Sequence, residues 1–167
     1  VASGAPVART TLDAWRAHLD VNATGAFLCT RAVLPGMIER GDGRIVTVAS
    51  IAGVTGARYT AAYTASKHAA VGLMRATAAE VAGTGVTANA VCPAFVRTDM
   101  TRRTVESIVE KTGRTAEEAQ SELEAMTPLG RLLEPDEVAA AVVFLASPEA
   151  AAINGQTLVL DGGGLQA

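Results

Sequence analysis

Apolar side chains recur every three or four residues from Leu12 onward, after a pair of threonines that can cap a helix. The pattern predicts a helix that runs to about Arg40, where glycine and aspartate at 41–43 end it. We expect a disturbance near residues 20–22, because asparagine and β-branched valine are weak helix formers, and strain at Pro35.

Two short runs of small and β-branched apolar residues predict buried strands. They cover residues 44–49 and 86–92, and each begins after a glycine or close to one. A long helix over about 61–82 separates them. A third strand is expected at 156–160, after a helix that begins at 134–137 with a proline where a first helical turn tolerates it.

This alternation of strand and helix indicates the α/β class, as a Rossmann-like doubly wound parallel sheet with about three strands and flanking helices. Two short helical patterns in the charged segment 99–126 predict a helical lid over the crevice at the strand ends. A glycine-rich turn for a pyrophosphate is missing near the start. We therefore interpret residues 1–167 as the C-terminal catalytic portion of a single domain, whose cofactor-binding half would precede Val1.

Composition excludes several classes of function. A net charge of −3 offers no basic surface for nucleic acid, and no apolar run is long enough for a membrane span. Cys29 and Cys92 have no histidine at metal-ligand spacing, so we expect two small buried side chains in a reducing compartment, and no metal site. The chain is therefore expected to be cytoplasmic.

Tyr63 and Lys67 are the strongest candidates for chemistry. Their spacing of four places a phenol and an ammonium on one face of a helix. A neighbouring cation favours the phenolate, so we expect Lys67 to lower the Tyr63 pKa from its usual value of about 10. Ser50 follows a predicted strand, where open α/β sheets build their sites, and Asn22 interrupts the first helix. Either of these two could instead be a purely structural residue.

Together these residues resemble the Asn, Ser, Tyr and Lys tetrad of the short-chain dehydrogenase/reductase family. The matching stretches are 21–25, 48–53 and Tyr63-x-x-x-Lys67. Residues 89–98 are similar to the family segment that covers the nicotinamide, with Ala94 where the family usually has glycine. Asp161-Gly162-Gly163 resembles the family's C-terminal signature.

The resemblance implies an oxidoreductase that uses NAD or NADP to move hydride between the nicotinamide and a ketone or secondary alcohol. Tyr63 would transfer the proton and Ser50 would bind the reacting oxygen. Lys67 would also hold the nicotinamide ribose, and Asn22 would fix a water that relays protons between Lys67 and solvent. His18 and Tyr59 belong to no pattern that we connect with this reaction.

The same resemblance implies a cofactor contact after the 86–92 strand. Val96 and Thr98 are the candidates for the nicotinamide carboxamide, and Pro93 and Ala94 would shape the wall beneath the ring. The resemblance also implies a homodimer or homotetramer packed through the two long helices.

For the substrate, we favour a 3-oxoacyl-type ketone, because the motifs resemble those of β-ketoacyl and polyketide ketoreductases. The alternative within enzymes is an NAD-dependent dehydrogenase of a small 3-hydroxy acid or a cyclic alcohol, since 3-hydroxybutyrate dehydrogenases are also similar. An alternative of another class is a non-catalytic binding protein that keeps the fold without the reaction.

Overall fold

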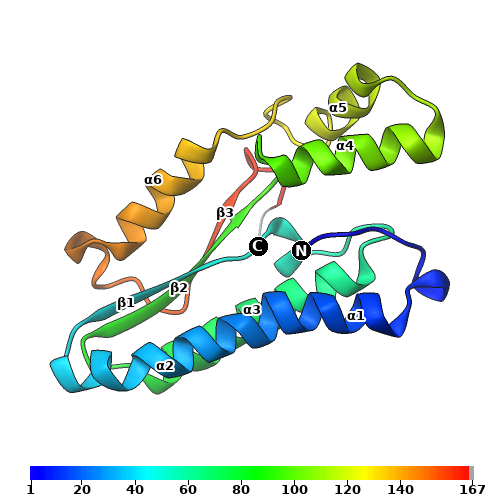
Figure 1. Cartoon of the computed structure of the whole chain (residues 1–167). Helices are drawn as coiled ribbons and strands as arrows, with labels where there is room; N and C mark the ends of the chain where they lie inside the picture. Colours follow the sequence, from blue (N-terminus) through cyan, green and yellow to red (C-terminus); the bar gives the residue numbers. More distant parts are fainter. Residues whose placement is uncertain (166–167) are drawn as a thin grey trace.

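The computed structural model describes residues 1–165 and is shown in Figure 1. The helices are α1 (Leu12–Leu19), α2 (Gly25–Arg40), α3 (Ala61–Glu80), α4 (Asp99–Thr112), α5 (Ala116–Glu124) and α6 (Pro135–Ala146). The strands are β1 (Gly43–Val48), β2 (Val86–Pro93) and β3 (Thr157–Leu160). None of the helices in this described part is long and apolar enough to cross a membrane.

The three strands form one parallel sheet in the order β1-β2-β3. Val48 of β1 lies opposite Val91 of β2, and Val91 in turn lies opposite Leu158 of β3. Every residue of the central strand β2 is buried, because the strand has a neighbour on each side and helices on both faces. The predicted α/β fold with a three-stranded parallel sheet is therefore confirmed.

Helices cover both faces of the sheet (Figure 1). α2 and α3 lie on one face, α6 packs against β1 and β2 on the other, and α4 and α5 lie beyond the carboxyl ends of β2 and β3. Small side chains let α3 approach the sheet closely. The core between them consists of Ala49, Val71, Met74, Ala78, Ala88, Ala90 and Cys92.

The predicted disturbance in the first long helix is a single π-helical turn, Asp20–Thr24, that joins α1 to α2. The Gly25 N–H donates to the carbonyl of Asp20, five residues back instead of four. The helix continues through Pro35 and ends at Gly41, whose positive φ of 68° suits glycine. The two helices therefore form one rod with an extra residue in one turn.

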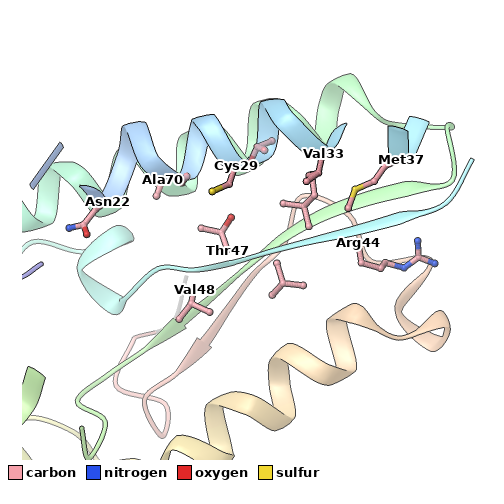
Figure 2. A pocket seen from close by; sticks show the side chains of 12 residues that line it. Asn22, Cys29, Val33, Met37, Arg44, Thr47, Val48 and Ala70 are labelled. Atoms are coloured by element: carbon pink, nitrogen blue, oxygen red, sulfur yellow. The ribbon is translucent and has the colours of Figure 1, made fainter. Parts of the chain in front are cut away.

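Two expectations about the fold and the burial of side chains differ from the structure. β2 includes Pro93 rather than ending at Cys92, because a proline at the end of a strand can still pair through its carbonyl side; Pro93 lies opposite Leu160. Cys92 is buried as expected, but the prediction that Cys29 is buried is wrong. Cys29 lines an open cavity of about 380 Å³ between α2 and β1, at the edge of the sheet (Figure 2).

Candidate active site

Tyr63 and Lys67 project from the first two turns of α3, and both side chains are half-buried. The Lys67 Nζ atom lies 5.8 Å from the centre of the Tyr63 ring. Nζ also donates a hydrogen bond of 3.2 Å to the carbonyl of Val48, the last residue of β1. The pair is thus held at the carboxyl end of the sheet, where parallel α/β folds bind ligands.

Ser50 follows β1 and caps the short 3-10 turn Ile51–Gly53, with its hydroxyl accepting from the Ala52 N–H at 3.1 Å. Gly53 lets this turn lie directly against α3, because a Cβ atom there would come within 3.0 Å of the Lys67 carbonyl oxygen. The Ser50 side chain acts on the phenol of Tyr63 and lowers its pKa. Ser50, Tyr63 and Lys67 are brought together.

Burial sets the electrostatics of this pair. Burial raises the pKa of Tyr63, and the hydrogen bond from Ser50 offsets only part of that rise. Burial also lowers the pKa of Lys67. The expected lowering of the Tyr63 pKa by Lys67 is therefore wrong for this structure, because burial of the phenol is the largest effect on this pKa and raises it.

Asn22 reaches the same helix from the π-helical turn. Its Nδ2 donates to Ser66 Oγ at 3.0 Å, and Ser66 Oγ donates to the Tyr63 carbonyl at 2.7 Å. Ser66 is completely buried, and it joins Asn22 to the turn that carries Tyr63. Sequence reasoning missed Ser66. Its position three residues after Tyr63, on the same helical face, was the available signal.

The segment after β2 lies at the same end of the sheet. Val96 pairs with Leu133 in a parallel bridge, and the carbonyl of Val96 accepts from the Thr101 hydroxyl at 2.6 Å. Thr98 precedes α4, with its hydroxyl 3.4 Å from the Val96 carbonyl. Ala94 needs no glycine conformation, since its φ is not positive. The candidate cofactor segment is therefore fixed by one backbone bridge and by threonine hydroxyls that contact the Val96 carbonyl.

Asp161 closes this end of the sheet after β3. Its side chain is buried and accepts from the N–H groups of Gly163 at 2.9 Å and Leu165 at 2.7 Å. Gly162 and Gly163 both have positive φ, which makes the tight turn possible. The C-terminal signature thus acts as a hydrogen-bonded turn.

The chain is similar in sequence to known reductases and dehydrogenases. A family model described as enoyl-(acyl carrier protein) reductase matches residues 1–164. D-beta-hydroxybutyrate dehydrogenase of Cupriavidus necator is 43% identical over 150 residues, which cover 89% of this chain and 58% of that protein. The 3-oxoacyl-(acyl-carrier-protein) reductase of Vibrio cholerae is 43% identical over 149 residues, covering 89% of this chain and 57% of that protein.

Solved structures of a ketoreductase and a dehydrogenase are similar to this fold. The structure of an actinorhodin polyketide ketoreductase variant with NADPH has a TM-score of 0.92 at 41% identity, and the match covers 98% of this chain and 63% of that one. Sorbitol-6-phosphate 2-dehydrogenase of Erwinia amylovora has a TM-score of 0.94 at 31% identity, covering 100% and 66%.

The parallel sheet, with polar residues at the ends of its strands, defines a Rossmann-like α/β protein. The similar sequences and solved structures identify the family within this fold class. The chain belongs to the short-chain dehydrogenase/reductase family. It spans 57% to 58% of the length of the two relatives described above.

Proposed function

We propose that this chain carries the catalytic residues of an NAD(P)-dependent oxidoreductase that interconverts a ketone and a secondary alcohol. The observation that carries the proposal is the Tyr63–Lys67 pair on α3, with the Ser50 hydroxyl beside the phenol at the carboxyl end of the sheet. This arrangement offers a proton donor, a hydrogen-bond donor for an oxygen and a cation in one place.

The donor set suits a nicotinamide cofactor, NAD or NADP. Lys67 can donate to ribose hydroxyls from the carboxyl end of the sheet, and the backbone at Pro93, Val96 and Thr98 borders the same end. When bound, the nicotinamide supplies or accepts the hydride. A relative solved with NADPH supports this assignment.

In the reductive direction, Tyr63 gives its phenol proton to the substrate oxygen, and the Ser50 hydroxyl donates a hydrogen bond to that same oxygen. In the oxidative direction, the phenolate takes the proton back. Lys67 steadies the negative charge on the phenolate. Asn22, joined to the Tyr63 turn through Ser66, holds a water on the route between Lys67 and solvent.

For the substrate, we propose a 3-oxoacyl-type ketone, supported by the reductase of Vibrio cholerae and the polyketide ketoreductase. The second candidate is a small 3-hydroxy acid oxidised with NAD, supported by the hydroxybutyrate dehydrogenase. We assign substrate selection to a lid over 99–126, since α4 and α5 pack together beyond the strand ends.

We further propose a cytoplasmic homodimer or homotetramer that packs through α2 and α3. Support comes from apolar side chains of α2 that are exposed in the single chain, among them Phe27, Leu28 and Val33.

Substitution of Tyr63 by phenylalanine tests the function. Turnover of 3-oxoacyl thioesters and of 3-hydroxybutyrate is measured with each nicotinamide cofactor. We expect Tyr63→Phe to lower kcat at least roughly 100-fold, because a positioned proton donor contributes about that much. Tyr59→Phe is the matched control, since Tyr59 is exposed and loses only a hydroxyl. Equal turnover by wild type and Tyr63→Phe contradicts the assignment. No turnover by a wild-type protein that binds NAD or NADP favours a non-catalytic binding protein.

A further inference from the structure

We propose that His18 is a positioning residue that orients the Tyr63 phenol, an inference that rests on the proposed function. His18 lies in the last turn of α1 and is only 3% exposed. Its ring packs edge-on against the Tyr63 ring, with centroids 6.4 Å apart and planes inclined by 78°. A buried imidazole thus forms one wall around the phenol.

Hydrogen bonds on both ring nitrogens fix the orientation of His18. Its Nε2 lies 3.1 Å from the backbone nitrogen of Ser3, and its Nδ1 lies 2.7 Å from the carbonyl of Ala14. A backbone N–H can only donate and a carbonyl can only accept, so Nε2 is the acceptor and Nδ1 carries the proton. The ring is therefore a neutral imidazole of one defined tautomer, and it cannot rotate without losing both bonds.

The segment bound by His18 also holds the backbone that leads into α3. Two residues after Ser3, the Ala5 N–H donates to the Tyr59 carbonyl at 2.7 Å, and Ala5 forms a parallel bridge with Thr60. Tyr59 has a φ of 65°, the only positive value outside glycine in the described part of the chain. These contacts hold Tyr59 in a conformation that non-glycine residues rarely adopt.

Tyr63 is therefore held from two sides. His18 contacts its ring directly, and the strap formed by residues 3–5 fixes the start of α3 four residues before it. Proton transfer depends steeply on the placement of donor and acceptor, so a phenol free to swing would transfer its proton more slowly. His18 itself supplies no proton to the substrate in this proposal. Its loss should lower kcat and leave KM nearly unchanged.

Three variants separate this role from general packing. His18→Leu removes both the ring and the acceptor for Ser3, whereas His18→Gln keeps an acceptor at the position of Nε2. His68→Gln is the matched control, because His68 makes the same type of bond to the carbonyl four residues back, Nδ1 to Thr64 at 3.0 Å, but is exposed. We expect kcat to fall roughly 10- to 100-fold in His18→Leu and less in His18→Gln, with no change in His68→Gln.

A second readout follows Tyr63 without turnover. Labelling the protein with 3-fluorotyrosine gives fluorine resonances that Tyr63→Phe and Tyr59→Phe assign to the chain's two tyrosines. Loss of the neighbouring ring in His18→Leu should shift and broaden the Tyr63 resonance, while His68→Gln leaves it in place. Melting curves identify any variant that fails to fold. If His18→Leu does not fold, His18→Gln is used in its place to test whether His18 orients Tyr63.

The inference is overturned if folded His18→Leu, or His18→Gln in its place, keeps wild-type kcat and an unchanged Tyr63 resonance. Failure of the proposed function looks different. In that case Tyr63→Phe keeps its activity, whereas the fluorine spectra still report whether His18 orients the Tyr63 ring.

Discussion

Replacing Asn89 with alanine tests what attaches β3 to the rest of the sheet. Asn89 lies in the central strand β2 with no exposed surface. Its Nδ2 donates to the Ile153 carbonyl at 2.7 Å, and its Oδ1 accepts from the Gln156 N–H at 2.9 Å. One side chain thus satisfies two backbone groups in the turn before β3.

The expected loss of stability follows from these two bonds. Alanine would leave the Ile153 carbonyl and the Gln156 N–H without partners, and each unsatisfied buried group costs roughly 1–3 kcal/mol. Water can reach part of this turn, so we expect the lower half of the sum, about 2–4 kcal/mol. A domain is typically stable by about 5–15 kcal/mol, so the loss is a large fraction of the total.

Urea unfolding followed by circular dichroism measures this difference. The midpoint should fall while the m-value stays constant, because the surface exposed on unfolding hardly changes. Gln156→Ala is the control, since that side chain is exposed and its removal leaves both backbone bonds to Asn89 in place. A loss below about 1 kcal/mol in Asn89→Ala would refute the reasoning, because it would be smaller than the cost of even one unsatisfied group.

Three further predictions concern pH and backbone conformation. Because burial raises the pKa of Tyr63, the phenol keeps its proton through neutral pH. The kcat for reduction should therefore be level from pH 6 to about 9, and the kcat for oxidation should rise with pH. A decline of the reductive kcat below pH 8 would contradict the raised pKa. The Arg131 guanidinium holds the pKa of Glu137 at about 2, below the ordinary 4.5. The higher melting midpoint of wild type over Glu137→Gln should therefore be present at neutral pH and disappear as pH falls from about 4.5 to about 2; a difference that persists below pH 2 would argue against the ion pair. Gly85→Ala should destabilise by more than about 1 kcal/mol in urea unfolding, because φ is 85° and a Cβ atom would lie 2.0 Å from a backbone oxygen. Gly83→Ala should lower the free energy of unfolding clearly less, because Gly83 has a φ of 81° but no atom of the described residues lies near the position of an added Cβ. Equal losses of stability in the two variants would show that the positive φ alone causes the effect.

The sequence predicted the helices and strands closely because their signals are local. The spacing of apolar residues, the glycine at 41 and the proline at 135 mark ends that the structure reproduces within about two residues. The form of the disturbance near residues 20–22 was not predictable. Weak helix formers indicate where a helix is easily distorted, but the π-helical turn is one in which Asn22 also meets Ser66, a residue of another helix.

In the candidate site, too, features that depend on local spacing were predictable, and features that depend on contacts between distant residues were not. Tyr63 and Lys67 could be paired from the sequence, because a spacing of four always places two residues on one helical face. The direction in which the Tyr63 pKa shifts could not be predicted from the sequence, because it depends on how deeply the fold buries the phenol. The contact of His18 with Tyr63 likewise joins residues of two helices.

The extra residue in the turn Asp20–Thr24 fixes the rotational phase of α1 relative to α2. Each residue of an α-helix advances its side chain by about 100°, and the wider turn absorbs one residue without that advance. If the same residues formed a regular α-helical turn, α1 would rotate by about that angle about the common axis. His18 would then turn away from Tyr63, although every side chain of α1 would be unchanged. The wider turn therefore keeps His18 against Tyr63 in a rod that contains one residue more than a regular helix of the same phase.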